Sequence, residues 1–336
     1  MASGKEVQSN LITGGAGFIG SHLAEYLLEQ GERVVIVDDL STGSLDNIKH
    51  LRSQRGLEFV HDTVLNRTLL DSLTANSDRV FHLAAAVGVE LIVKHPARVI
   101  ETNILGTETI LAVCVEYKVP VFIASTSEVY GKSEKMPFRE DDDIVLGPTS
   151  KSRWSYACSK AVDEFLALAY HQSRGLPAVV GRFFNTAGPR QTGQYGMVIP
   201  RFVGQALAGD PMTVYGSGEQ TRCFCHVRDV VAAVARLIEA PEAYGQVFNL
   251  GSRELVSMNE LAARVKDRTG SSSEITHVPF EEAYVSGFED IAAREPDISK
   301  ARAVVGFEPQ QTLDEILADV IASMQNRPAQ TDRAAR

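Results

Sequence analysis

A tyrosine and a lysine four residues apart, Tyr156 and Lys160, stand in the run YACSK. Residues at this spacing lie on one face of a helix. A nearby cation stabilises a phenolate, so the pair has the chemistry of a base that works near neutral pH. About 30 residues earlier, the strand-like run Val121–Ser125 leads into Thr126 and Glu128. This places a hydroxyl and a carboxylate at the carboxyl edge of a sheet, where open α/β sheets hold their ligands. Together these side chains predict hydride chemistry at an alcohol or sugar carbon.

A glycine-rich turn near the N-terminus predicts a dinucleotide site. Glycines recur at Gly14, Gly17 and Gly20, between a strand-like and a helix-like segment. Residues without side chains let the backbone approach a pyrophosphate, whose charge meets the N–H groups at the start of the helix. Asp38 follows 18 residues after Gly20, at the end of the next strand-like run. A carboxylate there accepts the ribose hydroxyls and repels a 2′-phosphate, so the predicted cofactor is NAD rather than NADP.

Strands and helices must alternate along the first half of the chain to position these groups. Strand-like runs fall at Arg33–Asp38, Leu57–His61, Arg79–Ala84, Val121–Ser125 and Ala178–Phe183. Helical patterns fall at Phe18–Gln30, Leu69–Leu73, Pro96–Tyr117 and Tyr156–Arg174. This alternation predicts an α/β fold, a Rossmann-like doubly wound parallel sheet with helices on both faces.

The second half of the chain predicts a smaller part with a different organisation. Beyond residue 185, Gly- and Pro-rich loops separate short elements, but the helix Val227–Ala240 and the strand Val247–Leu250 are regular enough to return to the main sheet. We therefore expect an NAD-binding domain over 1–184, with 226–251 returning to it. A C-terminal α/β substrate-binding part would comprise 185–225 and 252–325, and 326–336 would form a flexible tail.

Composition excludes several classes of protein. The 336 residues are 44% hydrophobic and 23% charged with a net charge of −10, which argues against nucleic acid as a partner. The longest apolar runs are too short for a membrane span, and the N-terminus lacks the layout of a signal peptide. The four cysteines are too few for a disulfide scaffold, and Cys223 and Cys225 lack the spacing and second ligand pair of a zinc site. We expect a cytoplasmic protein without a metal site.

Several motifs give the chain a resemblance to a known family. They are TGGAGFIGSHL (13–23), HLAA (82–85), STSEVYG (125–131), YxxxK (156–160), RFFNTAGPRQ (182–191), VYGSGEQTR (214–222), NLG (249–251) and REPDISKA (294–301). From about residue 11 to 320, the chain resembles an extended short-chain dehydrogenase/reductase of the NAD-dependent sugar-nucleotide epimerase, dehydratase and decarboxylase group. Within the group it is most similar to the UDP-glucuronate decarboxylases, or UDP-xylose synthases. The resemblance implies bound NAD, a UDP-sugar substrate and a homodimer joined by a four-helix bundle.

The resemblance also implies roles for individual residues. The implied catalytic set is Thr126, Glu128, Tyr156 and Lys160, with the tyrosine taking the proton of the C4 hydroxyl. The cofactor would contact the last two of these and Gly14, Gly17, Phe18, Ile19, Asp38, Asp62, Leu83, Ala84, Ala85 and Asn103. The substrate would lie against Arg153, Asn185, Val214, Tyr215, Arg222 and Arg294. An acidic protein that binds a diphosphate must supply local cations, which fits Arg222 and Arg294, and Arg153 would neutralise a uronate carboxylate.

Oxidation of the sugar at C4 leaves three possible reactions open. A C6 carboxylate gives a β-keto acid that can lose CO2, a C6 hydroxyl allows loss of water, and reduction from the other face inverts C4. The 4,6-dehydratases carry an Asp where this chain has Ser127, whereas Ser127, Glu128 and Arg153 match the decarboxylases. The loop over 84–96 is closer to the epimerases. We expect decarboxylation of UDP-glucuronate to UDP-xylose or the 4-keto-pentose, with a 4-epimerase as the alternative and a dehydratase third.

Overall fold

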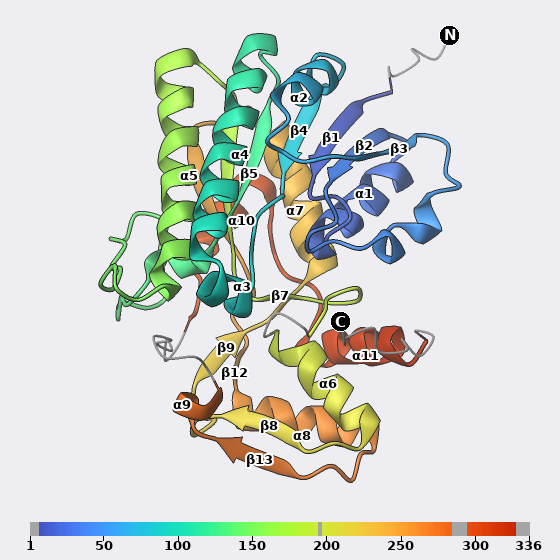
Figure 1. Ribbon diagram of the computed structural model, residues 1–336, viewed down its shortest axis with the longest axis vertical. Helices are drawn as coiled ribbons and strands as arrows, with labels where there is room; N and C mark the ends of the chain where they lie inside the picture. Colours follow the sequence, from blue (N-terminus) through green and yellow to red (C-terminus); the bar gives the residue numbers. More distant parts are fainter. Residues whose placement is uncertain (1–6, 194–196, 284–293, 327–336) are drawn as a thin grey trace.

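A seven-stranded sheet forms the centre of the protein (Figure 1). The computed structural model describes residues 7–193, 197–283 and 294–326. The strands run in the order β11-β6-β5-β4-β1-β2-β3, and each neighbouring pair is parallel. Their bounds are β1 (Ser9–Thr13), β2 (Arg33–Asp38), β3 (Leu57–His61), β4 (Arg79–His82), β5 (Val121–Thr126), β6 (Ala178–Phe183) and β11 (Gln246–Leu250). The predicted Rossmann-like doubly wound sheet is confirmed.

Helices cover both faces of this sheet (Figure 1). One face carries α1 (Phe18–Glu29), α7 (Val227–Glu239) and α10 (Ser299–Val305); the other carries α2 (Arg67–Thr74), α4 (Pro96–Tyr117) and α5 (Arg153–Arg174). Along β2, Val34 and Ile36 belong to the first core, whereas Val35 and Val37 belong to the second. Side chains alternate between the two faces of a strand, and both faces are buried here. This explains why the strands are continuous β-branched runs.

The smaller part lies beyond the carboxyl edge of the sheet (Figure 1). Its strands are β8 (Met212–Tyr215) paired with β13 (Ile275–Val278), and β9 (Thr221–Cys223) paired with β12 (Leu255–Ser257). Its helices are α6 (Val198–Ala208), α8 (Met258–Thr269), α9 (Phe280–Ala283) and α11 (Leu313–Gln325). Phe202, Leu261 and Ile316 lie in its separate hydrophobic core. The short parallel pair β7 (Thr186–Ala187) and β10 (Cys225–His226) lies where the chain passes between the two parts.

Later segments of the chain return to the main sheet. Strand β11 pairs with β6, and α7 packs against α1. Ile298, Ala301 and Phe307 also join the core that contains α1 and α7. Residues 298–307 therefore pack on the sheet, although they were expected in the substrate-binding part. Of the predicted tail 326–336, residues 327–336 lie outside the described residues.

The remaining described elements are short. They are α3 (Val89–Lys94) and the 3-10 turns η1 (Leu45–Asn47), η2 (Lys49–Leu51), η3 (Ser127–Tyr130) and η4 (Pro241–Ala243), the last of which connects α7 to β11. The short helix α3 was not predicted, and α5 begins three residues before its predicted start. Among the described helices, none is both long and apolar enough to cross a membrane.

Candidate active site

A cavity of about 1100 Å³ separates the carboxyl edge of the sheet from the smaller part. Parallel strands all end at this edge, so side chains distant in the sequence meet there. The predicted site residues that line the cavity are Gly14, Gly17, Phe18, Ile19, Asp38, Asp62, Leu83, Ala84, Ala85, Thr126, Glu128, Arg153, Tyr156, Lys160, Asn185, Tyr215, Arg222 and Arg294. The structure thus brings the cofactor, catalytic and substrate sets together in one place.

The glycine-rich turn leaves the start of α1 open to a ligand. Gly14 has a φ of +72°, and a Cβ there would lie 2.7 Å from the Cα of Ala84. A Cβ on Gly20 would lie 2.3 Å from the carbonyl oxygen of Gly14. Gly17 caps α1 without a side-chain hydrogen bond, and the first turn holds no acidic residue. The first N–H groups of the helix can therefore receive a pyrophosphate.

Two carboxylates at the ends of neighbouring strands fit the ribose side of NAD. Asp38 accepts hydrogen bonds from the backbone N–H groups of Ala16 (2.9 Å) and Leu40 (2.8 Å), one on each oxygen. Burial raises the pKa of Asp38, and these two bonds oppose that rise. Asp62 accepts from the side chain of Asn66 at 2.9 Å. Each oxygen of Asp38 keeps a lone pair for a ribose hydroxyl, so the residues present fit NAD.

Tyr156 lies in the first turn of α5 and lines the cavity together with Thr126. Burial, followed by the negative charges of Glu128 and Asp163, raises the pKa of Tyr156, and the Thr126 hydroxyl opposes the rise. The Lys160 ammonium donates to Asp163 at 2.6 Å. In the protein alone the phenol therefore holds its proton at neutral pH. A further positive charge beside it would favour the phenolate.

Glu128 lies between two buried arginines. Its Oε2 is 3.1 Å from Nη2 of Arg153, and its Oε1 is 2.6 Å from Nη1 of Arg294. Burial raises the pKa of Glu128, but Arg294, Arg153 and the more distant Arg222 together hold that pKa below its usual value. The two arginines are 7% and 6% exposed. The site therefore holds an ionised carboxylate and a surplus of positive charge, which suits an anionic sugar.

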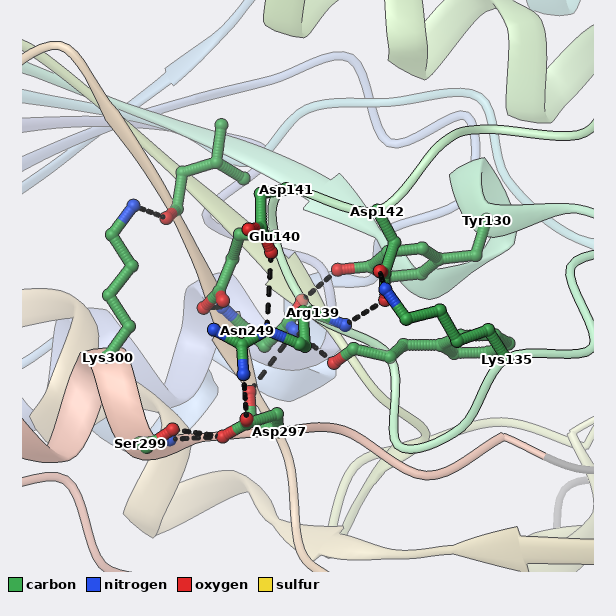
Figure 2. Close-up of polar contacts among 12 residues, drawn as sticks. Tyr130, Lys135, Arg139, Glu140, Asp141, Asp142, Asn249, Asp297, Ser299 and Lys300 are labelled. Carbon is green, nitrogen blue, oxygen red and sulfur yellow. Dashed lines mark hydrogen bonds and ion pairs between the residues drawn. The ribbon is translucent and has the colours of Figure 1, made fainter.

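A hydrogen-bond network around Asn249 ties the segment that carries Arg294 to η3 (Figure 2). The Tyr130 hydroxyl donates to Oδ1 of Asn249 at 2.7 Å. The Asn249 amide donates to the carbonyl oxygens of Phe138 (2.9 Å) and Asp297 (3.2 Å). Three segments that are far apart in the sequence therefore meet at one asparagine. Their junction fixes how Arg294 approaches the end of β5.

Asn185 and Arg222 approach the cavity from the connections to the smaller part. Asn185 has a φ of +34°, and its amide donates to the carbonyl oxygen of Cys223 at 3.2 Å. Arg222 lies in β9 and donates to the carbonyl oxygen of Thr221 at 2.8 Å. Both residues line the cavity on the side opposite the glycine-rich turn, which is where a sugar nucleotide must enter if NAD lies on that turn.

Two predicted site residues do not line the cavity. Val214 is fully buried in the core of the smaller part, so it supports Tyr215 from behind. Asn103 is 1% exposed; its Oδ1 accepts from the N–H of Ala86 at 2.8 Å, and its amide donates to Oγ of Ser159 at 3.1 Å. Asn103 thus fixes the loop after β4. In both cases the resemblance implied proximity to the site, but the direction of the side chain depends on packing.

Arg201 and Arg190 are among the cationic residues of the cavity wall that were not predicted from the sequence. Arg201 in α6 stacks over the ring of Tyr215 at 3.8 Å and donates to the carbonyl oxygen of Thr213 at 3.0 Å. Arg190 forms an ion pair with Glu25 and also lines the cavity. The sequence signals that could have pointed to them are the single arginine, Arg201, in the apolar run VIPRFVGQALA and the second arginine, Arg190, of RFFNTAGPRQ.

Comparison with known proteins identifies the family. The profile described as GDP-mannose 4,6 dehydratase matches residues 11–320. The chain belongs to this family. The resemblance expected from the motifs is therefore confirmed, and the match covers both the sheet and the smaller part.

Relatives in the family differ in the reactions that their names give. A UDP-N-acetyl-alpha-D-glucosaminuronate decarboxylase of Bacillus cytotoxicus is 44% identical over 93% of this chain and 96% of that protein. UDP-glucuronic acid decarboxylase 1 of Arabidopsis thaliana is 35% identical over 94% of this chain and 70% of that protein. A solved structure of UDP-glucuronic acid 4-epimerase from Bacillus cereus, in complex with UDP-glucuronic acid and NAD, has a TM-score of 0.85 at 28% identity and covers 95% of this chain and 99% of that one.

Proposed function

We propose that the protein is an NAD-dependent decarboxylase of UDP-glucuronate that forms UDP-xylose, the 4-keto-pentose, or both. The observation that carries this proposal is Glu128 held between Arg153 and Arg294 in the cavity that also contains Tyr156. Positive charge beside the catalytic hydroxyls suits a sugar with a carboxylate at C6. The names of the 44% and 35% identical relatives support the same reaction class.

The reaction begins with proton transfer at the C4 hydroxyl. NAD, when bound, would accept the hydride of C4, return it later and add a positive charge near Tyr156. The phenolate of Tyr156 takes the C4 hydroxyl proton, and Thr126 hydrogen-bonds the same oxygen. Lys160 favours the phenolate. We propose Thr126, Glu128, Tyr156 and Lys160 as the catalytic residues.

Loss of CO2 follows from the chemistry of the oxidised sugar. A ketone at C4 makes the C6 carboxylate a β-keto acid, and negative charge moves to the C4 oxygen as CO2 leaves. Tyr156, now protonated, and Thr126 both donate hydrogen bonds to that oxygen. Arg153 and Arg294 receive the uronate carboxylate, which shares them with Glu128. Arg222, Asn185 and Tyr215 would hold the UDP moiety.

A second candidate substrate differs only at C2. The relative with the higher identity is named for UDP-N-acetylglucosaminuronate, which has an acetamido group there. The C4 and C6 chemistry is the same for both sugars. The 4-epimerase remains the alternative reaction, since a 4-epimerase shares the fold at a TM-score of 0.85.

The test is to incubate the purified protein with NAD and, separately, UDP-glucuronate, UDP-N-acetylglucosaminuronate, UDP-glucose and dTDP-glucose. Mass spectrometry and proton NMR would follow the products. We expect loss of CO2 from a UDP-uronate and no reaction of UDP-glucose or dTDP-glucose. The uronate that is decarboxylated faster shows whether the enzyme prefers a hydroxyl or an acetamido group at C2. An unchanged mass with inverted C4 would make the protein an epimerase, and loss of water from a hexose would make it a dehydratase. Either result contradicts the proposal.

We propose in addition a cytoplasmic homodimer joined by a four-helix bundle. Helices α4 and α5 pack against each other at one side of the molecule (Figure 1). Exposed apolar side chains on these helices are Ile100, Leu105, Tyr117 and Phe165. Two copies of this helix pair would bury them in one interface, as apolar surface of this kind favours.

A further inference from the structure

Asp163 is a buried carboxylate that the reaction described above does not use. It lies in α5, one turn after Lys160, and is 0% exposed. Its Oδ2 accepts a hydrogen bond from the Lys160 ammonium at 2.6 Å, and the lysine is 2% exposed. Among the described residues, this is the ion pair that Lys160 forms. Because both charges are buried, each needs the opposite charge as its partner, and neither can contribute to the solubility of the protein surface.

Neighbouring elements surround the pair mainly with neutral groups. His82 in β4 is fully enclosed; burial and the Lys160 charge lower its pKa to about 3, so it is neutral. Its ring nitrogens are bonded to Thr13 (2.8 Å) and Thr107 (3.2 Å). Thr107, in α4, also lowers the pKa of Asp163, which burial raises and Lys160 lowers as well. The negative charge that pairs with the Lys160 ammonium, that of Asp163, therefore lies on the same helix, α5.

We propose that Asp163 is a positioning residue that holds the Lys160 ammonium in place and offsets its charge beside Tyr156. This inference rests on the proposed role of Tyr156 and Lys160 in proton transfer. The 2.6 Å hydrogen bond to the carboxylate fixes where the lysine nitrogen lies relative to the phenol. The negative charge of Asp163 also raises the pKa of Tyr156, which prevents the lysine from making the phenol too weak a base. One negative charge thus sets both the position of the lysine and the ionisation of the tyrosine.

The charge at position 163 predicts a direction for the pH profile. Other charged groups near the pair are Glu128 from η3 with its arginines Arg153 and Arg294, and Glu164, which pairs with Arg182. These stay unchanged when Asp163 becomes Asn. Removing this negative charge makes proton loss easier at Tyr156, whose pKa the Asp163 carboxylate raises. The acidic limb of the profile of kcat/KM should therefore move to lower pH, by about one unit.

The variant Asp163→Asn tests this, because its amide oxygen can still accept from the lysine while the charge is gone. Glu164→Gln is the matched control: it is the next residue of the same helix, buried, and bonded instead to Arg182 at 2.7 Å. We expect the control to leave the pH optimum in place. Asp163→Ser, which also removes the charge, must shift the profile in the same direction, and it serves if the Asn variant does not fold.

A second readout does not depend on turnover. Tyrosine labelled with ¹³C at Cζ reports ionisation by NMR, and a Tyr156→Phe sample assigns the Tyr156 signal. With NAD bound, we expect this signal to titrate at lower pH in Asp163→Asn than in the unmodified protein. If the signal shifts but the unmodified protein decarboxylates no UDP-uronate, the proposed function fails and the role of Asp163 stands. If decarboxylation is observed and neither the profile nor the signal moves, or either moves to higher pH, the role of Asp163 is disproved.

Discussion

Individual charges decide what each titratable side chain in the cavity can do. Burial and the carboxylates of Glu128 and Asp163 keep the phenol of Tyr156 protonated in the protein alone. Glu128 is kept ionised by Arg294 and Arg153 despite its burial. In the proposed mechanism, the tyrosine would become a base only when bound cofactor adds positive charge beside it, whereas the arginine pair could receive an anionic sugar beforehand.

Replacing Glu128 by Gln tests the division between oxidation at C4 and loss of CO2. Glutamine keeps the size but gives the two arginines no opposite charge, so they no longer hold the uronate in the right orientation. We expect C4 oxidation to persist while CO2 release falls about 100-fold, within the range for a displaced catalytic group. Rapid-mixing absorbance of NADH and trapping of CO2 measure the two steps.

Tyr156→Phe is the comparison for that experiment. It should abolish C4 oxidation itself while NAD stays bound, as checked by the cofactor content of the purified protein. Unchanged product formation in Glu128→Gln would remove the main reason to prefer decarboxylation over epimerisation.

Residue types that chemistry restricts were predictable from the sequence, and side-chain directions were not. Gly14 and Asp38 could be predicted to lie at the cavity because a close backbone approach and a predicted ribose contact permit few alternatives. Val214, which stands in a matching motif, and Asn103, which stands outside the quoted motifs, are both buried in the protein. Arg201 was missed because only its stacking on Tyr215 places it at the cavity. Such directions depend on packing between segments that the sequence does not show to be neighbours.

Among the elements, η3 and the segment after residue 293 depend on each other. Glu128 lies on η3 and Arg294 on that segment, so their ion pair joins the two directly. The network around Asn249 provides a second connection (Figure 2). Tyr130 stacks on Phe138 with ring centroids 4.5 Å apart, which makes the junction rigid. The relative placement of the acid and the arginine is therefore set at a point outside the cavity wall.

Tyr130→Phe should loosen this junction. It removes the hydroxyl that donates to Asn249 at 2.7 Å and leaves a buried oxygen unsatisfied. We expect the free energy of unfolding to fall by about 1–2 kcal/mol. We also expect kcat to fall while the Kd for NAD stays the same.

The control is Tyr244→Phe, which removes a hydroxyl bonded to the carbonyl oxygen of Ile238 at 3.1 Å, away from the cavity. It should lower stability without changing kcat. An equal change of kcat in both variants would contradict a role for the Asn249 network in placing Arg294. Denaturant unfolding and steady-state kinetics supply the measurements.

The order of helices and strands along the chain could be predicted from the sequence much better than the way in which these elements pack together. Alternating β-branched runs and helical patterns were sufficient to predict the sheet, and α4 has the predicted bounds. The short α3 was not predicted because six residues carry too little periodicity. Packing of 298–307 on the sheet was missed because its apolar residues fill a space that only α7 and β11 create.

On the scale of the whole molecule, the helix that carries the proposed base also carries the most exposed large apolar side chain in the described part of the chain. Phe165 on α5 is 66% exposed, and Leu105 on the adjacent α4 is 51% exposed. The proposed dimer would bury both. Each phenylalanine would then contribute about 2 kcal/mol to association.

Phe165→Glu should therefore produce a monomer. A carboxylate in the centre of an apolar interface is unfavourable in both copies, because symmetry brings the two copies of the patch together. Light scattering coupled to size exclusion measures the mass. Leu255→Glu, at a 43% exposed position on β12, is the control and should leave the mass unchanged. A dimer that persists in Phe165→Glu would place the interface elsewhere.

The chain crosses between the two parts several times: it leaves the sheet after β6, returns with α7 and β11, leaves for β12 and α8, returns at 298–307 and ends with α11. The smaller part is consequently not encoded by one continuous stretch of its gene. If recombination exchanged one continuous segment of the gene with that of a relative, the segment would encode pieces of both hydrophobic cores. The resulting chain would not pack correctly. A lineage with this topology must acquire new substrates through individual substitutions along the cavity wall, with the folding framework inherited intact.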